Sequence, residues 1–468
     1  MNTAFFKRYI GDRAFYRRVL AVALPILLQN LVTNFVSLLD NLMVGQTGTA
    51  SMSGVAVAGQ LFFIFNLVVF GTVSGPGIFC AQFWGAEDER AFKAAFRYKL
   101  FSALALCLLC LGAFALWGRP LCELYLTGEE ADRQAVLGCA MDYLRLMLWG
   151  MVPYTLSMVY ASTLRETGRT FAPMAASWTA VGVNLALNWI LIFGRLGAPA
   201  LGVRGAAIAT VISRFVEMGV NMVWSHLRRD EVLFTRRMLE GFPSGWRFIV
   251  TLAKKSVPLM LNETLWCVGM ATLMQIYSTR GLEVVAALNI AYVLLDLFNA
   301  ASFSIGTTIG ILVGQELGAG ELERARETDR RLLALGVFLA ACIGVVMLAA
   351  SGLFPRLYNT TPAIRTLAAQ LIRVMALVLP FDTFAAGCYF TMRSGGKTFV
   401  TFLFDSVFSW VVNVPVAYAL AHCTALPILP VYALSSFTVL AKCLSGAVMV
   451  RRGYWINRLS GKDMGSAL

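Results

Sequence analysis

The sequence predicts an all-α membrane protein in which twelve transmembrane helices form two pseudo-symmetric lobes of six. Of its 468 residues, 58% are hydrophobic and only 14% are charged, and the mean hydropathy is +0.70. Apolar runs of about 18 residues or more recur along the whole chain, and a soluble domain could not bury them all. A repeat of short motifs halfway along the chain predicts the two lobes. The net charge of +13 does not indicate nucleic-acid binding, because Lys and Arg are spread through short loops between the apolar runs.

Twelve apolar runs define the expected spans. The first follows a basic, amphipathic N-terminal stretch, and it is too long and too polar inside to be a cleaved signal peptide. The expected spans are 17–44, 53–80, 95–117, 135–161, 172–194, 203–226, 249–279, 284–314, 331–353, 364–390, 398–421 and 426–450.

The charge of the loops predicts the orientation. Alternate loops are rich in Lys and Arg, whereas the intervening loops hold far fewer, and this alternation continues through all twelve spans. Cytoplasmic loops are the basic ones, so we expect both termini in the cytoplasm of a bacterial inner membrane. The basic side includes Arg17, Arg18, Arg90, Lys93, Arg97, Arg165, Arg169, Arg228, Arg229, Arg324, Arg326, Arg393, Lys397, Arg451 and Arg452.

The longest charged connector, 227–248, separates two similar halves. We expect an N-lobe at 1–226 with spans 1–6, and a C-lobe at 249–468 with spans 7–12 and a basic cytoplasmic tail. Three motif pairs recur in the same order in the two halves. PILLQN (25–30) matches PLMLNE (258–263), AQFWGAEDERAFKAA (81–95) matches GQELGAGELERARET (314–328), and LRETGRTF (164–171) matches MRSGGKTF (392–399). Because each half has an even number of spans, the repeat is parallel and predicts a cavity between two lobes.

The first span carries the polar residues that point to function. Asp40 lies inside an otherwise apolar run, where a carboxylate costs about 2.5–3.5 kcal/mol on insertion scales. Gln29, Asn30 and Asn34 recur near helical spacing and give this helix a polar stripe. Asp40 is either a polar group satisfied by a neighbouring helix or an ion-titrating group of a transporter.

Two groups of side chains could hold a coupling cation. Asn184 and Asn188 are four residues apart and therefore share one helix face. With Asp40 and Thr210, they could supply oxygens to a hydrated proton or a sodium ion, as hard cations prefer. In the second half, Glu263, Asp382, Asn262 and Asn289 could form another cation site, with sodium held by Glu263 and Asp382.

The motifs resemble those of the multidrug and toxic compound extrusion (MATE) transporters. The resemblance rests on PILLQN…LLDNLMVG (25–45), GQELGAG (314–320), MRSGGKT (392–398), the six-plus-six repeat and the length. It implies a V-shaped pair of lobes that exports drugs in exchange for protons or sodium. By resemblance, Asp40 and Asn184 match the N-lobe coupling site, and Glu263 and Asp382 match the sodium-site acids of the NorM-like branch. Asn188 stands where some members carry an aspartate, so one charge is missing from the N-lobe site.

We therefore expect a cation-coupled antiporter that exports lipophilic, often cationic compounds by alternating access. The coupling ion is H⁺ or Na⁺, no other cofactor is expected, and the protein is expected to be a monomer in contact with membrane lipid and without a nucleic-acid partner. An apolar, aromatic cavity with a few acids suits such substrates. Its expected lining residues are Gln29, Asn30, Asn34, Phe35, Phe62, Trp266, Tyr292 and Asp296.

Three other functions fit the sequence less well. A lipid-linked oligosaccharide flippase of the same superfamily is the alternative, although such proteins usually carry cationic cavity residues for phosphate. An intramembrane enzyme is not expected, because the sequence lacks a paired His–Glu metal motif, a G-x-S-x-G motif and a phosphate-binding loop. The internal repeat and the acids inside spans argue against a receptor or scaffold.

Overall fold

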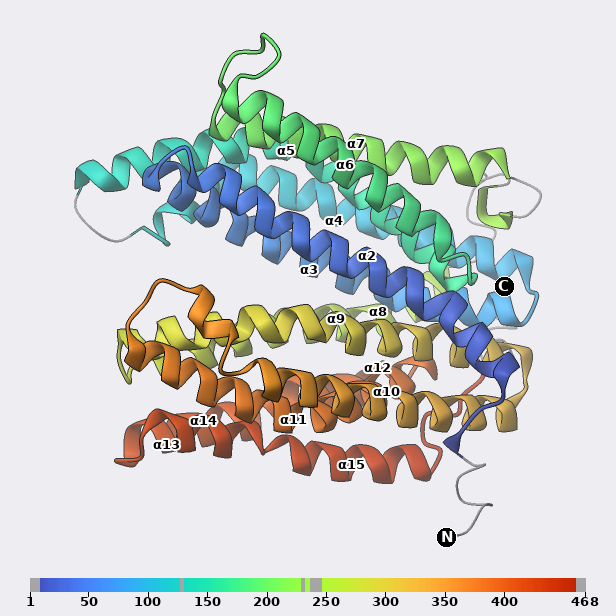
Figure 1. Cartoon of the computed structure of the whole chain (residues 1–468). Coiled ribbons are helices and arrows are strands. Elements are labelled where there is room, and N and C mark those ends of the chain that lie inside the picture. The colour runs from blue at the N-terminus through green and yellow to red at the C-terminus, as the bar shows by residue number, and fades with distance from the viewer. Residues whose placement is uncertain (1–8, 127–129, 229–231, 236–245, 460–468) are drawn as a thin grey trace. The chain divides into compact units, whose positions relative to one another are not determined.

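The computed structural model describes residues 9–126, 130–228, 232–235 and 246–459, and within these ranges all regular elements are helices (Figure 1). Residues 229–231 and 236–245 of the predicted connector, including Arg229, lie outside the described residues, as does the chain beyond 459.

Twelve helical spans among the described residues are long and apolar enough to cross a membrane, which confirms the predicted number. The first ten are α2 (Arg13–Gly45), α3 (Thr49–Gly85), α4 (Glu89–Glu123), α5 (Glu130–Glu166), α6 (Phe171–Phe193), α7 (Val203–Leu227), α8 (Trp246–Ser278), α9 (Leu282–Ala319), α10 (Leu322–Ala350) and α11 (Pro362–Ser394). The twelfth span comprises α14 (Ile428–Ser436) and α15 (Val439–Arg451). Two short 3-10 helices, η1 (Leu233–Thr235) and η2 (Phe354–Leu357), lie between spans.

The eleventh span differs from the single helix expected at 398–421. It consists of α12 (Thr398–Phe402), two π-helical segments, η3 (Leu403–Val407) and η4 (Ser409–Asn413), and α13 (Val414–Cys423). Ser406 in η3 donates to Asn262 of α8 from both its backbone nitrogen (3.3 Å) and its hydroxyl (2.8 Å). The irregular turn thus coincides with a contact between α8 and the eleventh span. The hydropathy of the sequence does not predict this contact.

Several helices continue beyond their apolar runs. α10 begins at Leu322 rather than at the expected 331, and its first turns carry paired charges, with Glu323–Arg326 at 2.6 Å and Glu327–Arg331 at 2.6 Å. Such pairs stabilise helices in water. The apolar run marks only the part of the helix suited to hydrocarbon, and the helix extends further.

The described chain divides into two compact units. The N-unit contains Leu28–Cys80 and Glu89–Leu252, and the C-unit contains Met1–Leu27, Ala81–Asp88 and Ala253–Ala467. The start of α2 and the end of α3 therefore belong with the second half of the sequence. The predicted division into lobes at 1–226 and 249–468 stays a prediction.

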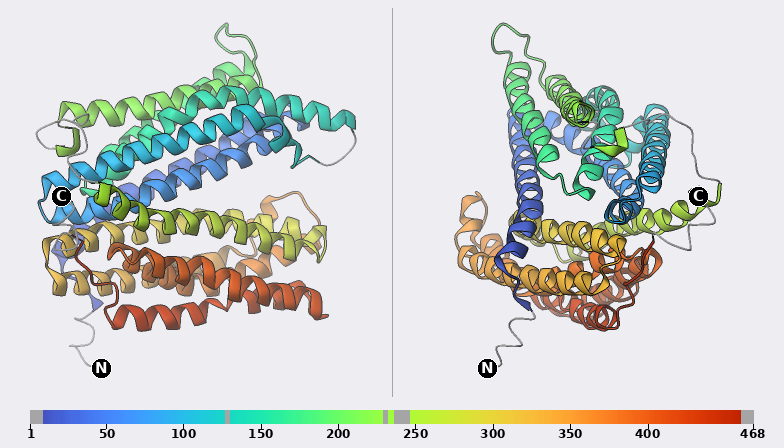
Figure 2. Two further views of the ribbon diagram at one scale, coloured as in Figure 1. Left: turned by 180° about the vertical axis from the view of Figure 1, so that it is seen from behind. Right: turned by 90° about the vertical axis from the view of Figure 1, so that its right-hand side faces the viewer.

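Each unit has its own helix packing, seen from two sides in Figure 2. In the N-unit, α7 packs against α5 and α6, and α4 packs against α5. In the C-unit, α9, α10 and α11 pack against one another, and α15 packs against α11. The start of α2 enters the C-unit core through Val19, Val22 and Ile26, and Ser304 Oγ donates to the Ala23 carbonyl at 2.6 Å. This packing positions the polar side chains of both units inside the spans.

Candidate functional site

The N-unit brings together the four residues predicted for its cation site. Asn188 Nδ2 donates to Asp40 Oδ1 at 2.6 Å and to Asn184 Oδ1 at 3.1 Å. Asn184 Nδ2 donates to Thr210 Oγ1 at 3.4 Å, and in its other amide orientation it donates to Asp40 Oδ1 at 2.9 Å. Both asparagines are buried. Helices α2, α6 and α7 thus place one carboxylate among neutral oxygen and nitrogen groups.

One atom of this cluster has no partner. Asn188 Oδ1 is buried and accepts no hydrogen bond among the described residues. A buried acceptor without a donor is unfavourable, and a bound proton donor or cation would satisfy it. Carboxylate and amide oxygens are also the ligands that hard cations prefer. The cluster therefore fits a hydrated proton or a small cation.

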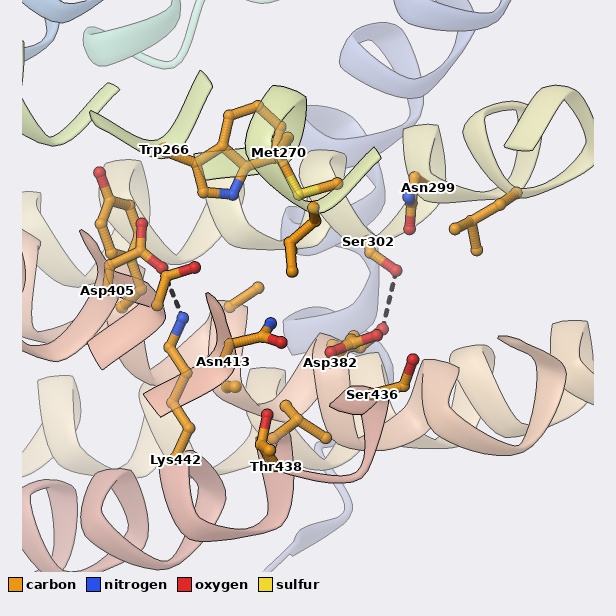
Figure 3. A pocket seen from close by; sticks show the side chains of 18 of the residues that line it. Trp266, Met270, Asn299, Ser302, Asp382, Asp405, Asn413, Ser436, Thr438 and Lys442 are labelled. Carbon is orange, nitrogen blue, oxygen red and sulfur yellow. Dashed lines mark hydrogen bonds and ion pairs between the residues drawn. The ribbon is translucent and has the colours of Figure 1, made fainter. Parts of the chain in front are cut away.

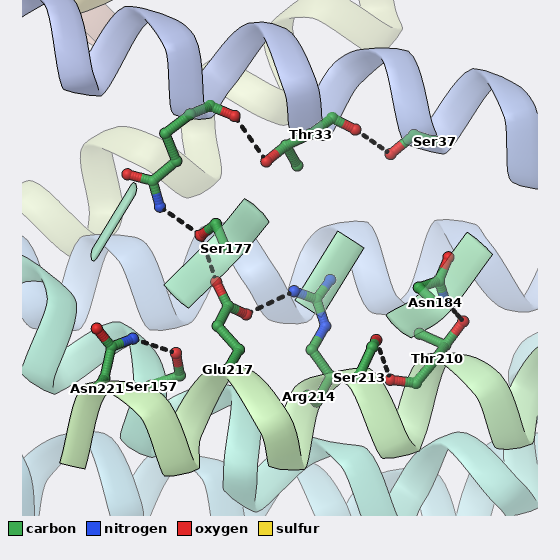
Figure 4. Close-up of polar contacts among 11 residues, drawn as sticks. Thr33, Ser37, Ser157, Ser177, Asn184, Thr210, Ser213, Arg214, Glu217 and Asn221 are labelled. Atoms are coloured by element: carbon green, nitrogen blue, oxygen red, sulfur yellow. Dashed lines mark hydrogen bonds and ion pairs between the residues drawn. The ribbon is translucent and has the colours of Figure 1, made fainter. Parts of the chain in front are cut away.

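A second polar chain in the N-unit includes Gln29, and Figure 4 labels its further members Ser177, Glu217 and Arg214. Gln29 Nε2 donates to Ser177 Oγ at 2.7 Å, and Ser177 Oγ donates to Glu217 Oε1 at 2.6 Å. Arg214 forms an ion pair with Glu217 at 3.1 Å and lies over the Tyr154 ring at 5.0 Å from its centroid. The charge of Glu217 is thereby neutralised.

The other N-unit residues predicted for the substrate cavity have different surroundings. Asn30 Nδ2 is buried without a hydrogen-bond partner in the described part of the chain, whereas Asn34 and Phe35 are exposed. Phe62 is buried and makes an edge-to-face contact with Phe114. Their role in substrate binding stays a prediction.

In the C-unit, Glu263 is bonded to a tyrosine. Tyr389 Oη donates to Glu263 Oε1 at 2.9 Å and lies 3.4 Å from Asn262 Nδ2. Asn262 Nδ2 also donates to Asp405 Oδ2 at 3.0 Å. Asp405 in turn forms an ion pair with Lys442. A continuous polar network thus joins α8, α11, the π-helical segment η3 and α15.

A cavity of about 550 Å³ opens within the C-unit (Figure 3). It is lined by three of the predicted cavity residues, Trp266, Tyr292 and Asp296, and by Asp382. Asp296 and Asp382 form no hydrogen bond or ion pair with any described side chain, whereas Asp405 and Lys442 line the cavity as a pair. An aromatic wall with two unpaired carboxylates suits a cationic, partly apolar ligand.

The predicted sodium site at Glu263 and Asp382 stays a prediction. Among the described residues, Glu263 belongs to the Tyr389 network and Asp382 lines the cavity, and no group of three or more His, Cys, Asp and Glu residues could hold a metal ion. Asn289 is exposed on α9. Of the four residues proposed for this site, the network brings together Glu263 and Asn262.

Asp405, Lys442 and Tyr389 were not among the predicted site residues. The first two are charged residues inside apolar runs, which is a signal for function in membrane segments. Tyr389 carries no such signal, because a tyrosine in an apolar run is ordinary. The partnership of all three depends on contacts between α8, α11, η3 and α15.

Comparison with known proteins agrees with the motifs. The MatE family model matches residues 25–190 and 258–419, one segment in each half of the sequence. A probable multidrug resistance protein NorM of Thermotoga maritima is 23% identical over 427 residues, which cover 90% of this chain and 89% of that protein. The probable multidrug resistance protein YoeA of Bacillus subtilis is 26% identical, with 89% of each chain covered.

Solved structures show the same fold. An outward-facing multidrug resistance MATE family transporter of the MOP superfamily superposes with a TM-score of 0.84 at 18% identity, covering 97% of this chain and 99% of the other. A MOP superfamily transporter from Pyrococcus furiosus, described as having a binding pocket of reverse polarity, gives a TM-score of 0.80 at 18% identity and covers 96% and 99%.

Proposed function

Since the chain belongs to the MatE family, we propose that it is a cation-coupled antiporter that exports lipophilic, often cationic compounds by alternating access. The observation that carries this proposal is the Asp40 cluster inside the first span. Asp40 is hydrogen-bonded to Asn188, whose own Oδ1 is buried without a donor in the described residues. A proton or sodium ion arriving there would supply the missing partner.

Coupling requires that the ion and the substrate favour different conformations. A ligand shifts a conformational equilibrium only through its different affinity for the two states. The Asp40 cluster joins α2, α6 and α7, so an ion that draws its oxygens together would change how these helices pack. Substrate binding would favour the other packing.

The substrate class follows from the C-unit cavity. Asp296 and Asp382 form no ion pair with any described residue, while Trp266 and Tyr292 supply aromatic surface. An organic cation gains from both features. A flippase for lipid-linked oligosaccharides would need cationic groups for phosphate, but the cationic side chain of this cavity, Lys442, is neutralised by Asp405.

The twelve spans and the family make this a multi-pass membrane protein. We place it in the bacterial inner membrane as a monomer surrounded by lipid, with both termini in the cytoplasm, because the basic loops alternate with poorly charged ones. A single cysteine at position 240, in a chain whose native cysteines have been replaced, should react with an impermeant maleimide only from the cytoplasmic side. Labelling from outside would contradict this topology.

Transport in proteoliposomes tests the function. The purified protein should move a fluorescent lipophilic cation against its gradient when a proton or a sodium gradient is imposed, with the two gradients applied separately. Vesicles that contain the Asp40→Asn variant are the matched control. Absence of gradient-driven movement with either ion would contradict the antiporter, and movement of a lipid-linked sugar would favour the flippase.

A further inference from the structure

The ion pair between Lys442 and Asp405 is a charged pair inside the spans that the proposed function does not use. Lys442 lies near the middle of the twelfth span, Ile428–Arg451, and Asp405 lies in the eleventh, Thr398–Cys423. Each side chain is only 17% exposed, and Nζ contacts Asp405 Oδ1 directly. Ionisable residues at such depth are rare and usually mark functional pathways.

Both oxygens of Asp405 are engaged. Oδ1 accepts from Lys442 Nζ, and Oδ2 accepts from Asn262 Nδ2 at 3.0 Å. The ammonium group also lies 5.3 Å from the centroid of the buried Phe404 ring, which adds a cation–π contact. The Lys442 ammonium group is therefore held by two neighbours, Asp405 and Phe404, and Asn262 fixes the other oxygen of its carboxylate partner.

The backbone around Asp405 is specialised for this arrangement. Asp405 lies in the π-helical segment η3, and such segments are rare and frequently occur at functional sites. Asn262 accepts hydrogen bonds from the backbone and hydroxyl of Ser406 while it donates to Asp405. The same side chain thus positions the π turn and the carboxylate.

From Asp405 the network continues through Asn262 and Tyr389 to Glu263. Lys442 thus stands at one end of a polar chain whose other end is an acid predicted to bind the coupling ion. In Figure 3 the Lys442 side chain extends towards Asp405 at the edge of the cavity that Asp382 also lines. A positive charge is therefore already present at one end of this network, which shares Glu263 with the predicted sodium site.

We propose that the Lys442 ammonium group is the resident cation at Asp405, so that this carboxylate binds no sodium ion while Lys442 is present. A hard cation needs free oxygen ligands, and both Asp405 oxygens are occupied. A sodium ion at this carboxylate would also meet the repulsion of a fixed ammonium. The consequence for transport, that Asp405 takes no part in sodium coupling, rests on the proposed function, whereas the binding statement does not.

Thermal unfolding of the purified protein tests the proposal without any transport assay. All variants carry Asp40→Asn, so that the N-unit carboxylate cannot contribute an ion response. The melting temperature is compared in NaCl and in choline chloride at equal concentration. With Lys442 intact, the difference between the two salts gives the sodium response of the other C-unit acids. Adding Lys442→Ala should produce a further sodium-specific rise of at least about 2 °C, because the freed Asp405 carboxylate can then bind the ion.

Two further variants identify the source of that rise. Adding Asp405→Asn to Lys442→Ala should remove the sodium-specific rise, since a neutral amide then replaces the carboxylate. Lys93→Ala is the matched control, because Lys93 forms a comparable ion pair with Glu89 on the exposed part of α4, and it should give no further sodium response. If the sodium-specific rise in melting temperature were no larger for Lys442→Ala than for Lys93→Ala, the proposal would be overturned.

A direct binding measurement covers the case in which Lys442→Ala does not fold. Two proteins with Lys442 intact, Asp40→Asn and the double variant Asp40→Asn with Asp405→Asn, are equilibrated with radioactive ²²Na⁺, and we expect the same saturable binding, or the same absence of it, in both. Saturable binding that only the protein with Asp405 shows would overturn the proposal. Because neither measurement requires export, a failure of the resident-cation proposal remains distinguishable from a failure of the antiporter proposal.

Discussion

Gly85 lies against the main-chain carbonyl group of Gln315, with no room between them for a side chain. The reciprocal contact places Gly318 against the carbonyl group of Gln82. In the sequence repeat, Gln82 corresponds to Gln315 and Gly85 corresponds to Gly318. The ends of α3 and α9 therefore meet through equivalent residues, and both contacts lie within the C-unit.

This contact predicts that Gly85→Val is strongly destabilising. A Cβ atom at position 85 would overlap the Gln315 carbonyl, and backbone atoms cannot swing aside as a side chain can. We expect a loss of at least about 3 kcal/mol and a clearly lower melting temperature. Gly138→Ala is the control, because a Cβ atom there meets nothing within 4 Å. Similar melting temperatures for the two variants would contradict the close approach.

Gln82 anchors the last described segment, around residues 457–459. Its Nε2 donates to the carbonyls of Ser394 (2.8 Å) and Asn457 (3.2 Å), and its Oε1 accepts from the Leu459 backbone nitrogen at 2.8 Å. Gln82→Ala would leave these buried groups without partners, at about 1–3 kcal/mol each. We expect a lower melting temperature and faster proteolysis after residue 452. Gln60→Ala is the control, because Gln60 is exposed, and it should change neither the melting temperature nor the proteolysis rate. If Gln82→Ala and Gln60→Ala gave the same values, Gln82 would not anchor this segment.

Asp40→Asn should reduce export to the level of empty vesicles while the protein still folds. The asparagine keeps an oxygen that can accept from Asn188, so packing is retained, but the charge that attracts a cation is lost. The measurement is gradient-driven dye export at matched protein levels. Asp142→Asn is the control, because Asp142 pairs with Arg204 at an exposed position, where such pairs contribute about 0–1 kcal/mol. Normal export by Asp40→Asn would reduce Asp40 to a structural role.

Glu263 and Tyr389 should behave as one functional group. Glu263→Gln and Tyr389→Phe each disturb the same 2.9 Å hydrogen bond. The export rate of the double variant should therefore be close to that of the slower single variant. The rates are measured under an imposed proton or sodium gradient. Losses that simply multiply would show that this hydrogen bond does not couple the two residues.

The predicted Glu263–Asp382 site implies that variants of these two acids also have non-additive effects on export. If both acids serve one site, Asp382→Asn should add little to the loss caused by Glu263→Gln. Independent losses would mean that Asp382 acts from the cavity wall by itself.

The sequence by itself determined the membrane class, the twelve spans and the Asp40 cluster. Insertion into a bilayer depends on the summed hydropathy of a local segment, which the chain displays directly. Asn184 and Asn188 share a helix face through their spacing, and an acid inside an apolar run needs neutral polar neighbours. The structure joins Asp40 to both, as these local rules led us to expect.

Only the tertiary structure decided which residues of the C-unit are partners. Glu263 is bonded to Tyr389, and Asp405 is paired with Lys442. These contacts depend on how each helix is rotated and on which helices are neighbours. The π turns at 403–413 add to this, because each wider turn changes the direction of the side chains that follow. The start of α2 likewise joins the C-unit through apolar packing of Val19, Val22 and Ile26, and Ala81–Asp88 joins it through the close backbone contacts at Gly85 and Gly318. Linear periodicity contains neither kind of contact.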